Sequence, residues 1–216
     1  LYRFEDHGGR RVALRFDLTV PLARFVAQHH NDLGLPFKRY HIGTVWRGEN
    51  TQRGRYREFV QCDFDTIGST SVAVDVETGL VIHELLRAIG FERFEIRIND
   101  RRMLNGVLER VGLADRAVPV LRALDKLDKI GPDGVRAEWR ERGFSEAQCA
   151  ALEPALQPMG DLNATLDRMA AWLSESAAGA AAVEELRWLV ARASATGRLE
   201  LDVTLARGLN YYTGCI

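Results

Sequence analysis

The sequence predicts an α+β fold whose strands and flanking helices are interrupted by an all-helical insertion. Before residue 100, several short runs alternate apolar and polar residues, as half-buried strands do. From Asp100 to about Gly197, apolar residues recur every three or four positions, which is the spacing of one helix face. Alternation returns between Leu199 and Leu205. We therefore expect a core formed by residues 1–99 and 198–216, with a helical subdomain at 100–197 between them.

The first 99 residues contain recognisable strand and helix signals. The predicted elements are a strand at Val12–Phe16, a helix from Pro21 to near Gly34, hairpin strands at Arg39–Trp46 and Phe59–Phe64, a helix at Val76–Ile89 and a strand at Phe94–Ile98. Proline fits the first turn of a helix, where its missing N–H is not needed. Gly90 suits the position just after a helix, where the backbone often turns left-handed.

The insertion is divided into short helices by its glycines and prolines. The breakers are Gly131-Pro132, Gly143, Pro154 and Pro158. Apolar residues such as Met103, Val107 and Val111 share a face and predict burial. The alanine-rich run from Ala177 to Ala182 fits either a helix or a loose connection.

The composition excludes several classes of protein. With 46% hydrophobic and 27% charged residues among 216, the chain is neither disordered, collagen-like nor a small disulfide scaffold. The 29 basic residues balance 30 acidic ones, so no overall positive field indicates nucleic-acid binding. Three scattered cysteines predict no disulfide framework, no bound metal and a reducing, cytoplasmic setting. No apolar run is long enough to cross a membrane. A start without Met indicates a piece of a longer protein.

The hairpin concentrates charged and polar side chains. Between Lys38 and Arg57 there are six basic residues and one acid, a net charge of +5, whereas the whole chain carries −1. One face of the second strand carries Phe59, Gln61, Asp63 and Asp65. Arg47 and Glu49 are expected to share a face of the first strand. Such a face suits a small ligand that carries both charges; a solvated basic turn and an ordinary sheet with one wet face are the alternatives.

Two further segments are candidates for a site. Alternation places on one side of the chain Arg15, Asp17 and Thr19, although a helix cap explains Asp17 or Thr19 equally well. The run from Ala206 to Gly214 follows a strand and carries Arg207, Tyr211 and Tyr212. That run fits either a pocket or a turn at the end of a strand.

These segments resemble the motifs of a known family. Residues 47–49 (RGE) and 54–65 (GRYREFVQCDFD) are similar to the second signature motif of class II aminoacyl-tRNA synthetases. Residues 14–21 (LRFDLTVP) and 206–214 (ARGLNYYTG) narrow the resemblance to the histidyl-tRNA synthetases. The last run is similar to that family's histidine signature, with Asn210 in place of the usual Asp. The resemblance covers nearly the whole chain and implies the class II antiparallel sheet flanked by helices.

The resemblance implies a reaction and a set of ATP-binding residues. The family joins histidine to ATP, with Mg²⁺ as the phosphate counterion, and transfers it from the adenylate to tRNA(His). By similarity, the catalytic residues Arg47 and Arg207 contact the α-phosphate, where negative charge develops. Arg55 would bind the outer phosphates and Phe59 would stack on adenine. Glu49 would lie near the adenine or the last nucleotide of the tRNA.

The resemblance also implies a histidine pocket. The ammonium group of the bound histidine would be held by Asp17, Thr19 and Gln61. Asp65 and Tyr212 would bind the imidazole, with Arg207 and Tyr211 beside them. A buried acid and a hydroxyl reject apolar side chains strongly, because both would be left unpaired.

Several expectations concern the whole protein. A homodimer interface, a further ATP-binding arginine and an anticodon-binding domain are expected outside this chain, so the segment alone is an incomplete site. The insertion's arginines (Arg101, Arg102, Arg136, Arg140 and Arg142) are either solvated helix faces or phosphate contacts to tRNA. Two alternatives to the enzyme are a histidine-sensing regulatory subunit of ATP phosphoribosyltransferase and a non-catalytic interaction fragment. The ATP-binding arginines favour the enzyme, because a sensor does not need them.

Overall fold

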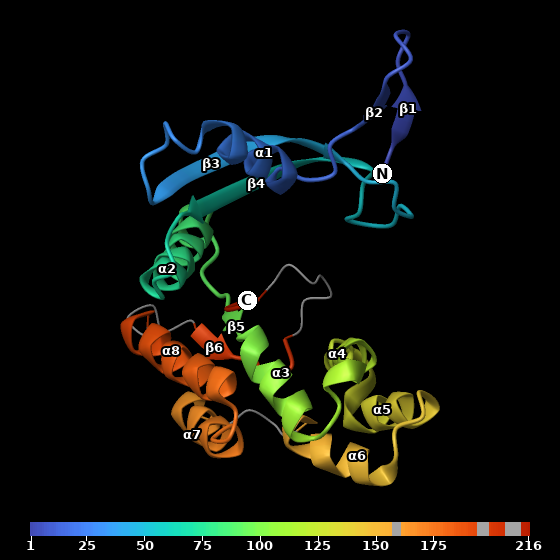
Figure 1. Ribbon diagram of the computed structural model, residues 1–216, viewed down its shortest axis with the longest axis vertical. Coiled ribbons are helices and arrows are strands. Elements are labelled where there is room, and N and C mark those ends of the chain that lie inside the picture. Colours follow the sequence, from blue (N-terminus) through green and yellow to red (C-terminus); the bar gives the residue numbers. More distant parts are fainter. Residues whose placement is uncertain (157–160, 194–198, 206–212) are drawn as a thin grey trace. The chain divides into compact units, whose positions relative to one another are not determined.

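The computed structural model describes residues 1–156, 161–193, 199–205 and 213–216, which fall into two units, Leu1–Thr70 and Ser71–Ile216. The first unit contains β1 (Arg3–Glu5), β2 (Arg11–Ala13), α1 (Thr19–His29), β3 (Phe37–Trp46) and β4 (Glu58–Ile67). The main elements of the second are α2 (Ala73–Ala88), β5 (Ile96–Ile98), α3 (Arg101–Arg110), α4 (Ala117–Leu124), α5 (Leu127–Glu141), α6 (Glu146–Leu152), α7 (Leu162–Trp172), α8 (Ala177–Ala193) and β6 (Leu199–Leu201) (Figure 1). The predicted boundaries at 99/100 and 197/198 remain a prediction.

The long hairpin forms as the sequence predicts. Strands β3 and β4 pair antiparallel over ten residues each, from Phe37 opposite Ile67 to Trp46 opposite Glu58. Both strands extend beyond the predicted limits. At the closed end, the Trp46 indole N–H donates to Glu58 Oε2 (2.7 Å). In the tip, Gly54 has a φ of +78°, a left-handed conformation that glycine adopts without strain. The register therefore decides which side chains face each other across the hairpin.

Two elements of the first unit are shorter than predicted. The first helix ends at His29 rather than near Gly34, because the next residues close a turn, with the amides of Asp32 and Leu33 donating to the His29 carbonyl. The strand predicted at Val12–Phe16 is confined to β2, which pairs with β1. The Leu14 amide still donates to the Tyr2 carbonyl (3.0 Å), but from Arg15 on the chain leaves this pairing and bonds to β3.

The second unit is mainly helical, as the spacing of its apolar residues predicts. Asp100 caps α3 by accepting from the Arg102 amide (2.8 Å). Ser145 and Gln148 form a reciprocal capping box at the start of α6. Gly131, with a φ of +69°, bends α5 at the predicted break. The alanine-rich run from Ala177 to Ala182 is the first part of α8, which settles the alternative left open by the sequence.

The largest buried core lies in this helical unit. Helix α3 packs against α8, α4 against α5, and α7 against α8 (Figure 1). Trp139 is the largest fully buried side chain, with Val120 and Val135 also fully buried in the same cluster. None of the helices among the described residues is long and apolar enough to cross a membrane.

The ends of the helical stretch meet in a small sheet. Strand β5 pairs parallel with β6, which follows it by about a hundred residues, from Ile96 opposite Leu199 to Ile98 opposite Leu201. The last residues continue this sheet in the antiparallel sense, since Asn99 and Ile216 exchange two backbone hydrogen bonds of 2.9 and 2.8 Å. The fold is thus a mixture of helices and small sheets. The strands β3 and β4 are antiparallel, as the resemblance implies, whereas β5 and β6 are parallel.

Candidate active site

The polar face of the hairpin is the sheltered face. Its side chains, Arg39, His41, Gln61, Asp63 and Asp65, are all partly buried. On the opposite face several apolar side chains are exposed, since Tyr40 is 77%, Ile42 61% and Val60 65% accessible, although Phe64 is partly buried. An ordinary sheet with one wet face would show the reverse arrangement. The predicted division of β4 into two faces is thus observed, and the sheltered polar face is the better candidate for a ligand site.

Residues 14–18 cover part of this polar face. The Arg15 guanidinium donates to the Thr44 carbonyl (2.6 Å), and the Trp46 amide donates to the Arg15 carbonyl (2.9 Å). Leu18 is fully buried together with Val45 of β3. Gly43 leaves room for the Arg15 guanidinium, since a Cβ there would lie 3.4 Å from its Nη2 and 3.3 Å from His41 Nε2. The first unit thus places this segment over β3.

Asp17 and Thr19 lie at the start of α1. The N-cap residue of α1 is Leu18, which makes no side-chain cap, but the Asp17 carboxylate just before it accepts from the Val20 amide (3.0 Å) in the first turn of the helix. Thr19 is exposed at the first position of the helix. A hollow of about 520 Å³ adjoins this segment and is lined by Arg15, Phe16 and Asp17 among others. A small ligand could enter there.

Arg47 is held at the centre of the candidate site. Its Nη2 donates to Gln61 Oε1 (3.1 Å) and its Nε donates to the Phe16 carbonyl (3.2 Å). The guanidinium also lies over two aromatic rings, 4.6 Å from the centre of Phe16 and 5.0 Å from that of Phe59. Phe16 was missed by the sequence argument, because alternation assigned it to the far side of a strand that does not extend to this residue.

The two acids of β4 have different partners. Gln61 Nε2 donates to Asp63 Oδ1 (2.7 Å), so Gln61 links Asp63 to Arg47. Asp65 faces Arg39, whose Nη2 lies 3.0 Å from Asp65 Oδ2. Burial raises the pKa of the Asp65 carboxyl above its ordinary value, and the charge of Arg39 opposes that rise. The face therefore presents fixed groups of both charges, which suits a zwitterionic ligand.

The tip of the hairpin is more open. Glu49 and Arg55 are exposed and form a loose ion pair of 3.7 Å. Strand β3 ends at Trp46, so Glu49 lies in the loop, and the expectation that it shares a strand face with Arg47 is wrong.

Four residues of interest, Arg207, Asn210, Tyr211 and Tyr212, lie outside the described residues, so their predicted roles are untested.

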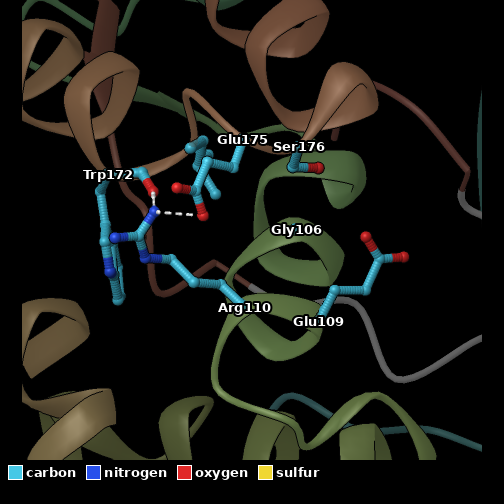
Figure 2. A pocket seen from close by; sticks show the side chains of 7 residues that line it. Gly106, Glu109, Arg110, Trp172, Glu175 and Ser176 are labelled. Carbon is cyan, nitrogen blue, oxygen red and sulfur yellow. Dashed lines mark hydrogen bonds and ion pairs between the residues drawn. The ribbon is translucent and has the colours of Figure 1, made fainter.

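A second hollow lies within the helical unit and is a poorer candidate. Figure 2 shows it between α3 and the junction of α7 with α8, with a volume of about 260 Å³. Its Arg110 donates to the Trp172 carbonyl (2.9 Å) and lies 3.6 Å from Glu175. Gly106 makes room for Ser176, whose hydroxyl caps α8 through the Gly179 amide (3.2 Å). These polar groups bond to the protein itself, and none of the predicted site residues lines the hollow.

The insertion's arginines are mostly engaged in ion pairs. Their partners are Asp100 and Glu185 for Arg102, Glu153 and Asp133 for Arg136, Glu146 for Arg140 and Glu138 for Arg142. Local neutralisation of this kind favours solvated helix faces over phosphate contacts.

Among the described residues, no group of three or more His, Cys, Asp or Glu side chains is placed to hold a metal ion.

An antiparallel hairpin that carries a fixed arginine, followed along the chain by a mainly helical unit, agrees with the arrangement that the resemblance to class II aminoacyl-tRNA synthetases implies. The family model for histidyl-tRNA synthetases matches residues 1–216. The chain belongs to the histidyl-tRNA synthetase family.

Individual relatives agree with this assignment. The chain is 53% identical over its whole length to a histidine–tRNA ligase of Rhodopirellula baltica and 47% identical to that of Wolinella succinogenes, and it spans 50% of each protein. The crystal structure of the Nostoc histidyl-tRNA synthetase superposes on 99% of this chain with a TM-score of 0.87, at 33% identity and over 50% of its own length. The chain thus spans about half the length of the curated relatives it matches.

A further solved structure bears on the alternative function. It is described as an ATP phosphoribosyltransferase regulatory subunit/histidyl-tRNA synthetase from Bacillus halodurans. It superposes on all of this chain and on 56% of its own length, with a TM-score of 0.80 at 26% identity. This more distant likeness keeps the regulatory alternative open to a direct test.

Proposed function

We propose that the full-length protein containing this chain is a histidine–tRNA ligase. The histidine carboxylate attacks the α-phosphorus of ATP, the bond to the β-phosphate oxygen breaks, and pyrophosphate leaves. The acyl group of the histidyl-adenylate then passes to a ribose hydroxyl at the 3′ end of tRNA(His), and AMP leaves. The observation that carries this proposal is Arg47, fixed by Phe16, Phe59 and Gln61 on a sheltered face that also holds carboxylates.

Arg47 supplies the fixed positive charge that the first step requires. Negative charge on the α-phosphate oxygens grows in the transition state, and a cation already in place stabilises it without reorganisation. Arg207 is proposed to act on the same phosphate. Arg55 would bind the outer phosphates, and exchanging its loose contact with Glu49 for a phosphate costs little, since both side chains are exposed. Phe59 would stack on adenine and Glu49 would lie near the adenine or the tRNA end.

The carboxylates and amide of the same face provide the amino-acid pocket. Asp17, Thr19 and Gln61 are proposed to bind the ammonium group, and Gln61 is already oriented by its bonds to Arg47 and Asp63. Asp65, together with Tyr212, would accept from and donate to the imidazole, with Tyr211 beside them. This donor–acceptor set selects histidine over apolar amino acids of similar size.

The remaining partners follow from the family. We propose that ATP enters with Mg²⁺ as its phosphate counterion, that tRNA(His) is the acceptor, and that the whole protein is a homodimer through segments outside this chain. The three cysteines are free thiols, which supports a reducing, cytoplasmic setting.

Amino-acid-dependent exchange of pyrophosphate into ATP tests the proposed function. We expect the full-length protein to catalyse exchange with histidine and with no other standard amino acid, because only the imidazole satisfies both the acid and the hydroxyl of the pocket. Exchange driven by a different amino acid would contradict the proposal. Histidine binding without exchange would instead favour the regulatory alternative.

A further inference from the structure

Arg39 joins two parts of the proposed histidine pocket that are far apart in the sequence. It lies on β3 directly opposite Asp65 of β4, and only 15% of the Arg39 side chain and 23% of the Asp65 side chain are accessible. Its Nη2 lies 3.0 Å from Asp65 Oδ2. The same nitrogen donates to the carbonyl of Leu18 (3.1 Å). One guanidinium therefore contacts both the acid proposed to bind the imidazole and the backbone near the ammonium site.

The contact with Leu18 fixes the residues on either side of it. Leu18 is fully buried and stands between Asp17 and Thr19, which are proposed to hold the ammonium group. Burying a guanidinium as far as that of Arg39 costs free energy unless the group is paired, so both of its contacts stabilise this arrangement. Arg39 thus links the segment that carries the proposed ammonium ligands to the acid proposed for the imidazole.

The pair also retains unused hydrogen-bonding capacity. Among the described residues, Asp65 Oδ2 is buried and faces only the Arg39 guanidinium, at 3.0 Å from its Nη2, while Arg39 Nε is buried without a hydrogen-bond partner. Buried polar atoms in native proteins are nearly always satisfied, by protein, water or ligand. Because a carboxylate oxygen has two lone pairs, Asp65 Oδ2 can accept an imidazole N–H while it remains paired with Arg39.

We propose that Arg39 is a positioning residue for substrate selection, which holds the Asp65 carboxylate in place to accept the imidazole N–H of histidine. This inference rests on the proposed histidine-activating function. Arg39 touches neither the α-phosphate nor the attacking carboxylate in this account, and it acts through Asp65 and through the segment around Leu18.

The charges around Asp65 make the inference measurable by pH. Arg39 and His41 of β3 and Asp63 of β4 face the carboxyl: the first two lower its pKa, and Asp63 raises it together with burial, the largest cause. Loss of Arg39 therefore raises the pKa of Asp65 further. Because the protonated acid is a poorer acceptor for an N–H, histidine binding should then be lost at a higher pH than in the wild type.

The test is the variant Arg39→Met in the full-length protein, assayed by histidine-dependent exchange between about pH 5 and 8. We expect the KM for histidine to rise about tenfold or more, since a half-buried charge loses its partner. The KM for ATP should stay near that of the wild type. The acid limb of kcat/KM for histidine should move to higher pH, because the charge of Arg39 no longer lowers the pKa of Asp65. The imidazole of free histidine titrates equally in every assay. A difference between the acid limbs of the wild type and the variant therefore reports on the protein.

Two further variants separate positioning from folding. Arg39→Lys keeps the charge but lacks the planar guanidinium, so we expect the acid limb near its wild-type position and a smaller rise in the KM for histidine. This variant decides the question if Arg39→Met does not fold, because a wild-type KM for histidine in Arg39→Lys would then overturn the inference. Arg24→Met, the same kind of change at an exposed position of α1, is the matched control and should leave all parameters unchanged.

The possible failures are distinguishable. Equal rises in both KM values with an unmoved acid limb would give Arg39 a purely structural role and overturn the inference, as would an Arg39→Met variant indistinguishable from the wild type. In both cases the wild-type exchange with histidine would leave the proposed function intact. Absence of exchange and of histidine binding in the wild type would overturn the proposed function, and the inference with it.

Discussion

Replacing Arg47 by Ala is expected to lower the rate of histidine activation by about a hundredfold to a thousandfold, the usual cost of removing one fixed group that stabilises transition-state charge. Arg47 is preorganised by the carbonyl of Phe16 (3.2 Å), the amide oxygen of Gln61 (3.1 Å) and the rings of Phe16 and Phe59. The measurement is kcat for histidine-dependent exchange of pyrophosphate into ATP in the full-length protein.

Two controls define what the Arg47→Ala result means. Arg47→Lys retains a positive charge but cannot contact Phe16 and Gln61 with separate nitrogens, so we expect an intermediate rate. Arg24→Ala removes an exposed arginine from α1 and should leave the rate unchanged. A rate for Arg47→Ala within a few fold of the wild type would remove this residue from the phosphate-binding role.

Replacing Trp139 by Ala is expected to destabilise the helical unit by about 3–5 kcal/mol, as large-to-small substitutions of buried aromatic residues do. Trp139 has no accessible surface and packs in the cluster that contains Val120 and Val135. Its neighbours lie on helices fixed by their own contacts, so the cavity cannot close completely. Unfolding in urea, followed by the loss of helical circular dichroism, measures the change in the free energy of unfolding.

Trp188→Ala is the matched control for this prediction. Trp188 lies on α8 with 37% of its surface accessible, and its ring stacks with the Arg192 guanidinium (3.8 Å). Loss of an exposed cation–π contact costs about 0.5–1 kcal/mol, so this variant should be only slightly destabilised. Comparable destabilisation by the two substitutions would show that Trp139 does not anchor the core.

Local patterns account for the elements that the sequence located correctly. The two faces of β4 follow from the two-residue period of a strand, and this period does not depend on the rest of the fold. The helices from α3 to α8 follow from three- and four-residue spacing interrupted at Gly131 and Gly143, both of which have positive φ values. The local signal was ambiguous in the run from Ala177 to Ala182. This run is helical in the structure, where α8 packs against α3 and α7.

The strand predicted at Val12–Phe16 shows how tertiary contacts override such patterns. Alternation fits an extended chain there, yet the pairing with the first strand ends at Leu14, and Arg15 and Leu18 bond to β3 instead. That bend brings Phe16 against Arg47 and Leu18 against Arg39. Neither contact has a local signature, because each joins residues that are more than twenty positions apart.

The sequence by itself determined the family, the hairpin, the run of helices after Asp100 and the set of polar residues on one face of β4, because each rests on residue identities or on a short-range period. Only the tertiary structure decided that the polar side chains of the hairpin are partly buried while Tyr40, Ile42 and Val60 on the other face are exposed, and that Arg39 pairs with Asp65. The same holds for the ion pairs that engage arginines of the insertion. The physical reason is that burial and charge pairing depend on which distant segments meet, and strand register and chain bends set that in three dimensions.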